Sequence, residues 1–253
     1  MIPLSHHEDL EKARNWRFAQ TPESLRESRA LLEHMRSDYP HVLAIGHELI
    51  LVLEKMGELD RAIQELQNLE QVFPKLDEET LSRGGKIHKM LATTAPGGQA
   101  VDHLKKAEEY YRRAGETGGF YPRINELTVR LLRAAKLAEL GNESDAQKVL
   151  HCVQKDALEF LNTEGWIARK SDDNVWLPAT QGEAAFLAGN FAAAEAAYIN
   201  ARAAANGKVF YLRSMQEQLK SLCDAFKKLN IPVSGPLTQP DTFFAIPEAA
   251  PAA

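Results

Sequence analysis

Three segments of the sequence concentrate polar, cationic and aromatic side chains beyond what helix packing requires. The first, residues 81–89, places cationic and titratable side chains around a double glycine. The second, residues 120–125, opens with two aromatic residues and closes with an isoleucine and an asparagine after an arginine. The third, residues 174–180, contains a tryptophan and a threonine. Aromatic faces, amides and cations that converge in this way would suit a nucleotide or another phosphorylated small molecule.

A fourth group of candidates lies on the last expected helix, where Ser214 and Gln218 stand one turn apart. Trp176, Thr180 and Glu183 are likewise spaced to share one helical face. The second segment lies at an expected helix start, where free backbone N–H groups favour anions. Capping, loop anchoring and a solvated helix face explain most such residues when each is taken alone. The candidate ligand-binding residues are Arg83, Lys86, His88, Lys89, Tyr121, Arg123, Asn125, Trp176, Thr180, Glu183, Ser214 and Gln218.

The common local signatures of catalysis do not occur in the sequence. It has no glycine-rich phosphate loop with Lys and Ser or Thr, no Gly-x-Ser-x-Gly elbow and no His-Glu-x-x-His motif. Two cysteines are too few for a disulfide framework or a Cys-rich metal site. We therefore expect a binding protein with no catalytic residues, no metal and no cofactor, rather than an enzyme.

Composition and charge exclude several classes of partner. The chain has 253 residues, of which 44% are hydrophobic and 26% charged, as in globular proteins that bury a core. A net charge of −5 argues against nucleic acid as a partner. No apolar run approaches the roughly 20 residues that span a bilayer, and the start of the chain has no secretion signal. These features predict a cytoplasmic protein without membrane or nucleic-acid partners.

One spacing recurs three times: a glycine, an alanine five residues later, and a bulky apolar residue four residues after that. The instances are Gly57, Ala62 and Leu66, then Gly141, Ala146 and Leu150, then Gly189, Ala194 and Tyr198. Glycine supplies the positive φ needed past a helix end, and the small alanine lets two antiparallel helices approach closely. This helix–turn–helix unit is typical of tetratricopeptide repeats, whose period is about 34 residues. The sequence therefore predicts an all-α, tetratricopeptide-like solenoid of helical hairpins; a non-solenoid helical bundle is the alternative.

The predicted organisation is an N-terminal helical segment at 1–39, a repeat domain at 40–230 and a Pro/Ala-rich tail or linker at 231–253. A helix is expected to begin near Thr21 and Pro22, because Thr can cap a helix and Pro suits its first turn. First helices of such hairpins are expected to line a concave side. The expected hairpins cover about 41–73, 77–114, 122–161 and 175–205, followed by a capping helix at about 209–229, while Phe243 and Phe244 are apolar enough to dock back on the body.

These segments resemble the tetratricopeptide-repeat sensor domain of bacterial conflict and signalling systems. That domain is related to the TRAF-binding central region of the apoptosis-signal-regulating MAP kinase kinase kinases. The resemblance covers about residues 40–225. It rests on Asp77-Glu78-Glu79-Thr80-Leu81 leading to Gly85-Lys86-Ile87-His88-Lys89, on Phe120-Tyr121-Pro122-Arg123-Ile124-Asn125, on Trp176 with Ala179-Thr180, and on Ser214 with Gln218-Leu219.

The resemblance implies a non-enzymatic regulatory domain that senses a nucleotide-type ligand, NAD-derived ligands having been suggested, and controls an effector. Four positions depart from the family pattern: Lys86 replaces Arg, His88 replaces Tyr, Arg123 replaces Gly, and Glu217 stands where Arg is usual. The alternative function is a protein–protein interaction scaffold that binds a peptide or partner helix in the groove.

Overall fold

The computed structural model describes residues 4–116, 119–162 and 173–246, and within these ranges the chain is helical and has no β-strand. This confirms the predicted all-α class. The α-helices are α1 (Leu4–Ala19), α2 (Pro22–Asp38), α3 (Leu43–Lys55), α4 (Leu59–Val72), α5 (Glu78–Thr94), α6 (Gly97–Gly115), α7 (Phe120–Glu139), α8 (Glu143–Leu161), α9 (Asp173–Leu187), α10 (Phe191–Ala205), α11 (Val209–Lys228) and α12 (Pro240–Phe243), and a 3₁₀ helix η1 spans Pro236–Thr238.

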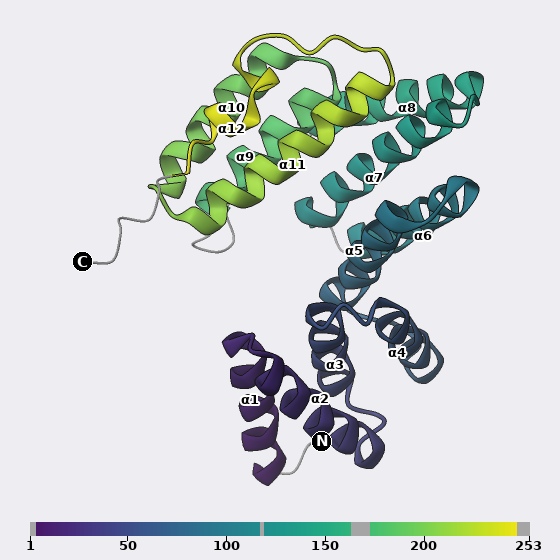
Figure 1. Ribbon diagram of the computed structural model, residues 1–253, viewed down its shortest axis with the longest axis vertical. Coiled ribbons are helices and arrows are strands. Elements are labelled where there is room, and N and C mark those ends of the chain that lie inside the picture. Colours follow the sequence, from purple (N-terminus) through teal and green to yellow (C-terminus); the bar gives the residue numbers. More distant parts are fainter. Residues whose placement is uncertain (1–3, 117–118, 163–172, 247–253) are drawn as a thin grey trace.

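Helices that follow one another in the chain pack as hairpins: α1 with α2, α3 with α4, α5 with α6, α7 with α8, and α9 with α10. Figure 1 shows these pairs following one another upwards from the purple end to α7–α8, with α9–α10 beside α7–α8 at the top. Helix α11 has no hairpin partner of its own length and lies against α7 and α9. The arrangement is a helical-hairpin solenoid closed by a C-terminal helix, as the repeat spacing predicted.

The three repeat glycines end their helices as the spacing predicted. Gly57, Gly141 and Gly189 have φ values of 74°, 78° and 79°, which lie in the left-handed region that favours glycine. The alanine five residues after each glycine is completely buried. Because each alanine lacks a bulky side chain, the second helix of the hairpin approaches the first closely, and the repeat spacing therefore specifies these three turns.

Other glycines let an aromatic ring from the second helix press on the backbone of the first. A Cβ atom at Gly182 would lie 2.9 Å from the ring of Tyr198, and one at Gly85 would lie 2.7 Å from the ring of Tyr111. Both rings are almost completely buried. A Cβ atom at Gly84 would lie 2.6 Å from Leu66 of α4 and 2.9 Å from the Tyr110 ring of α6, so packing against α4 and α6 explains the double glycine of α5.

The N-terminal hairpin contains a helix, α1, that the sequence reading did not separate from its surroundings. It buries Leu10 and Ala13 against α2, and the Ser28 hydroxyl donates to the Ala13 carbonyl at 2.8 Å. Helix α2 begins as predicted, because the Thr21 hydroxyl accepts from the Ser24 backbone N–H at 3.1 Å.

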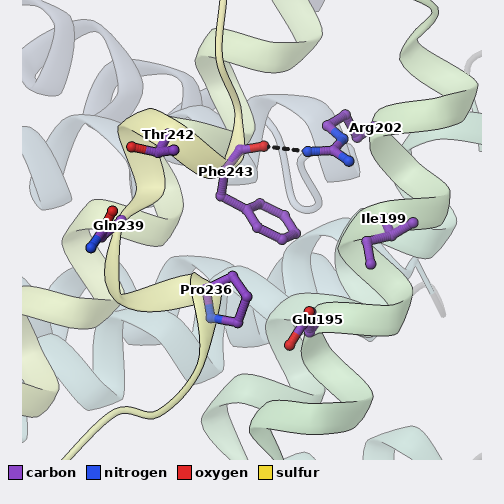
Figure 2. A pocket seen from close by; sticks show the side chains of 7 residues that line it. All are labelled: Glu195, Ile199, Arg202, Pro236, Gln239, Thr242 and Phe243. Atoms are coloured by element: carbon purple, nitrogen blue, oxygen red, sulfur yellow. Dashed lines mark hydrogen bonds between the residues drawn. The ribbon is translucent and has the colours of Figure 1, made fainter.

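The described part of the C-terminal segment packs against α10 and α11. Phe244 is fully buried, with its ring centroid 5.5 Å from that of Tyr198. The Arg202 guanidinium donates to the Phe243 carbonyl at 2.7 Å, and Figure 2 shows this contact. The apolar residues of the segment thus dock on the body. No helix in the described ranges is long and apolar enough to cross a membrane.

Candidate ligand-binding site

Polar side chains from four helices meet in what we call the inner cluster: Lys89 of α5, Thr128 of α7, Glu183 of α9 and Gln218 of α11. Glu183 Oε1 accepts from the Thr128 hydroxyl and from Gln218 Nε2, the latter at 2.5 Å. Lys89 Nζ donates to Gln218 Oε1 at 3.2 Å, across a sequence separation of 129 residues. The inner cluster therefore ties α5 directly to the capping helix, beyond the contacts between neighbouring hairpins.

Of the two charged members of the inner cluster, Glu183 is buried and Lys89 is half-buried. Glu183 is 8% exposed, and burial raises the pKa of its carboxyl group against the opposing effects of Thr128, Gln218 and Lys89. Burial lowers the pKa of the Lys89 ammonium, while the charge of Glu183 opposes that shift. Removing the Lys89 charge would leave the Glu183 carboxylate buried without the cation that favours its charged form, which costs more than losing an exposed pair would.

A second group of charges, which we call the Glu54 ion cluster, joins α3 to α5. Lys86 Nζ donates to Glu54 Oε1 at 2.5 Å, and Arg83 Nη1 lies 3.5 Å from Glu54 Oε2. The Glu54 side chain is 6% exposed, whereas those of Arg83 and Lys86 are 29% and 39% exposed. The two cations are therefore accessible from solvent, while the carboxylate between them is not.

Tyr121 of α7 connects the two groups. The residue is 50% exposed, yet burial raises the pKa of its hydroxyl, which interacts electrostatically with Arg83, Glu183 and Glu54, while the Tyr111 hydroxyl opposes the shift. The ring therefore has an exposed flank and a desolvated hydroxyl. One turn further along, Asn125 Nδ2 donates to the Tyr121 carbonyl at 2.9 Å, so this amide holds the start of α7.

Aromatic rings lie on α9 and α11, towards the start of each helix. The ring centroid of Trp176 is 5.2 Å from that of Tyr211 and 6.4 Å from that of Phe210. Trp176 and Tyr211 each precede their own helix's member of the inner cluster by seven residues. Seven residues are two turns, about 10 Å of helix, so both rings fall on the same face as the polar side chains.

His88 lies outside these groups, although it was predicted to belong to them. It is 4% exposed, its ring stacks on Tyr110 at 5.6 Å, and its Nδ1 lies 3.1 Å from Nδ1 of His103. Burial lowers the pKa of His88 to about 4, with the charges of His103 and Lys106 acting in the same direction. His88 therefore serves the packing of α5 on α6. No group of three or more potential metal ligands occurs among the residues that the structure describes.

Arg123 also points elsewhere: its guanidinium lies over the Phe160 ring, 5.1 Å from the centroid, and joins α7 to α8. Thr180 is buried one turn before Glu183, and Ser214 is half-buried one turn before Gln218. The structure thus brings six predicted residues together, with Trp176, Asn125, Thr180 and Ser214 along the same helices. The six are Arg83, Lys86, Lys89, Tyr121, Glu183 and Gln218.

Sequence reasoning missed Glu54, Thr128 and Tyr111. Glu54 ends an apolar helix just before a repeat glycine, and its sequence context offers no sign of a functional charge. Thr128 stands seven residues after Tyr121, and this heptad spacing is the one signal that could have placed it on the same face.

Two shallow hollows in the described residues lie away from the inner cluster. One, of about 280 Å³, is lined by residues of α2, α3 and α4. The other, of about 340 Å³, lies between α10 and the C-terminal segment and is drawn in Figure 2. Neither is lined by any predicted site residue. The second is lined by Glu195, Ile199, Arg202, Pro236, Gln239, Thr242 and Phe243.

The fold defines a tetratricopeptide-type domain, a class of regulatory or protein-interaction modules that are generally non-catalytic. The family model described as Tetratricopeptide Repeats-Sensor matches residues 24–130. This part of the chain matches the tetratricopeptide-repeat sensor family, which confirms the resemblance seen in the sequence over these residues. The match ends within α7, so Glu183 and Gln218 lie beyond it.

A solved structure supports the same fold. TTC0263, a thermophilic tetratricopeptide-repeat protein of Thermus thermophilus, is similar to this chain at 16% sequence identity with a TM-score of 0.51. The similarity covers 84% of this chain and 99% of that one. No curated protein matches the chain.

Proposed function

We propose that this chain is a cytoplasmic, non-catalytic sensor domain that holds a small nucleotide-like ligand beside the inner cluster and controls an effector protein. The inner cluster carries the proposal. Hairpin packing alone does not require a buried carboxylate bonded from two helices, or a lysine of a further helix that reaches one of those two. Burying such charges costs free energy, so their presence favours a functional role.

The chemistry beside the inner cluster matches the parts of a nucleotide. Arg83 and Lys86 are partly exposed cations that suit a phosphate, since a guanidinium can bind it through two hydrogen bonds. The exposed flank of Tyr121 and the ring of Trp176 offer aromatic faces for a base. Glu183 accepts hydrogen bonds from hydroxyl and amide donors already, and sugar hydroxyls are donors of the same kind.

Coupling to an effector follows from the elements that the inner cluster joins. In a solenoid each repeat contacts chiefly its neighbours, so a bond from α5 to α11 restrains the curvature of the hairpins between them. A ligand that binds one curvature more tightly than another shifts the population towards it. An effector that recognises that curvature would then respond to the ligand.

Thermal unfolding with NAD, ADP-ribose and cyclic nucleotides tests the proposal. A ligand present at 100 times its Kd adds about 2.7 kcal/mol of stability, which corresponds to a Tm increase of roughly 5–10 °C for a chain of this size. We expect Lys86→Ala to lose this shift. Lys148→Ala, which alters an exposed ion pair on α8, should keep it. If none of these compounds raises Tm in the unaltered chain, the proposal is wrong.

A peptide-binding scaffold is the second candidate, and an exposed apolar patch favours it. Phe210 is 72% exposed and Val209 40% exposed at the start of α11, next to Trp176. Such a patch suits the apolar face of a partner helix. Under this alternative, Phe210→Ser abolishes capture of a protein partner, whereas a nucleotide-dependent Tm shift would survive the same substitution.

A further inference from the structure

Glu54 occupies an unfavourable place for a carboxylate. It is the second-last residue of α3, where the carbonyl groups of the helix give its end a partial negative charge. Its side chain is 6% exposed, so water does little to stabilise the charge. The cations of α5 are what hold the Glu54 carboxylate in this position.

The carboxylate is also incompletely bonded. Glu54 Oε2 is buried and has no hydrogen-bond partner, and Arg83 Nη1 lies 3.5 Å away from it. A buried acceptor without a hydrogen bond has lost its contacts with water and gained none from the protein. Glu54 therefore occupies the position between Arg83 and Lys86 but does not accept all the hydrogen bonds that these two cations can donate.

We propose that the Glu54 carboxylate stands in for a phosphoryl group of the ligand, and that the ligand binds by displacing it. This inference rests on the proposed function and adds to it the class of group that Arg83 and Lys86 receive. A phosphoryl group has three terminal oxygens, so it can accept both hydrogen bonds of the Arg83 fork and that of Lys86 together. The displaced Glu54 regains water at the end of α3.

Glu48 of the same helix shows what a purely structural carboxylate looks like. Its side chain is 3% exposed, and it binds Arg17 and Arg14 of α1. Arg14 also binds Glu11 at 2.5 Å, so this cation keeps a carboxylate partner when Glu48 is removed, and Arg17 keeps its contact with the Phe18 ring.

Arg83 and Lys86, the two cations around Glu54, have no second carboxylate partner in the described part of the chain. Among the described residues, Glu54 is the sole carboxylate within 4.0 Å of Arg83 or Lys86. Removing Glu54 should therefore leave a vacant anion site with two accessible cations, whereas removing Glu48 frees Arg17, whose side chain is 15% exposed.

Anion rescue of Glu54→Ala tests the inference, with Glu48→Ala as the matched control. Thermal unfolding is measured at constant ionic strength in chloride, acetate and inorganic phosphate. We expect phosphate to raise the Tm of Glu54→Ala by several degrees more than it raises that of Glu48→Ala or the unaltered chain, and to act more strongly than acetate. Equal shifts in the two variants overturn the inference, and a larger effect of acetate overturns its assignment to a phosphoryl group.

A second variant and a nucleotide arm complete the test. Glu54→Gln removes the charge and keeps the shape, and it should show the same order of anion effects if Glu54→Ala does not fold. ADP-ribose should bind Glu54→Gln at least tenfold more tightly than the unaltered chain, and equal affinities overturn displacement. A phosphate effect specific to the Glu54 variants, with no nucleotide bound by any form, supports the anion position and rejects the proposed function.

Discussion

The α5–α6 and α9–α10 hairpins share one packing contact, a tyrosine ring against a glycine, but differ in the surroundings of the tyrosine hydroxyl. In both, a tyrosine of the second helix lies against a glycine of the first: Tyr111 on Gly85 and Tyr198 on Gly182. The Tyr111 hydroxyl interacts with that of Tyr121 and so reaches the candidate site. The Tyr198 hydroxyl is buried and has no hydrogen-bond partner. The same tyrosine–glycine contact can therefore be purely structural or contribute to a site, depending on which residues surround the tyrosine hydroxyl.

The surroundings of the two hairpins extend this difference. Between α5 and α6, His88 contacts His103 and stacks on Tyr110, whose hydroxyl donates to Glu70 at 3.0 Å. The α10 helix is instead rich in alanine and packs apolar side chains against α9 and the C-terminal segment. We conclude that α9–α10 is mainly a scaffold, although its first helix contributes Glu183 to the site.

The largest expected effect comes from adding a methyl group at the tighter of the two crossings. In Gly85→Ala the new Cβ would lie 2.7 Å from the buried Tyr111 ring, against 2.9 Å from Tyr198 in Gly182→Ala. Overpacking costs about 1–3 kcal/mol, and we expect Gly85→Ala to lie near the top of this range and Gly182→Ala near the bottom. Urea denaturation measures both, and a larger loss in Gly182→Ala would contradict the comparison.

An intermediate effect is expected from acid, and it should arise in the α5–α6 hairpin. Burial lowers the pKa of His88 from 6.5 to about 4, with His103 and Lys106 contributing. Between about pH 6.5 and pH 4, His88 is therefore protonated in the unfolded chain and neutral in the folded chain. The free energy of unfolding thus falls as pH decreases from about 6.5 to about 4.

Replacing His88 by tyrosine tests the source of this acid sensitivity. His88→Tyr should flatten the loss of unfolding free energy over that pH range, measured by urea denaturation at each pH. His151→Asn, on the exposed side of α8, serves as the control. An undiminished slope in His88→Tyr would show that other groups carry the acid sensitivity.

The smallest expected effect distinguishes the two tyrosine hydroxyls. Tyr198→Phe removes a buried hydroxyl that has no partner, so we expect it to be neutral or to stabilise the chain by up to about 1 kcal/mol. Tyr111→Phe removes the interaction of this hydroxyl with Tyr121 and should destabilise by about 1 kcal/mol. Denaturation midpoints of the pair should therefore differ in this order, and an equal loss in both would mean that the hydroxyls are equivalent.

The fold could be predicted from the sequence because its turns depend on local chemistry. Gly57, Gly141 and Gly189 each need a left-handed backbone, and that need is met within one hairpin. Helix α1 was not separated from its surroundings because it has few apolar residues, of which Leu10 and Ala13 are the buried ones.

The candidate site could be predicted only in part, because its contacts join residues far apart in the sequence. Lys86 and Lys89 are one turn apart and share a face, whereas His88 lies about 100° from Lys89 around the helix and faces α6. Glu54 could not be predicted as a site residue because the cations that bind it lie on another hairpin. Charge pairing between hairpins sets these roles, and local sequence patterns do not encode it.

Hydrogen–deuterium exchange in the presence of ADP-ribose measures the central claim most directly. We expect the bound nucleotide to slow exchange in α5, α7, α9 and α11, the four helices that supply the inner cluster. The exchange rates in the second helices of the hairpins should change less. Slowed exchange confined to α10 and residues 236–244, where the hollow of Figure 2 lies, would place the ligand elsewhere and contradict the account.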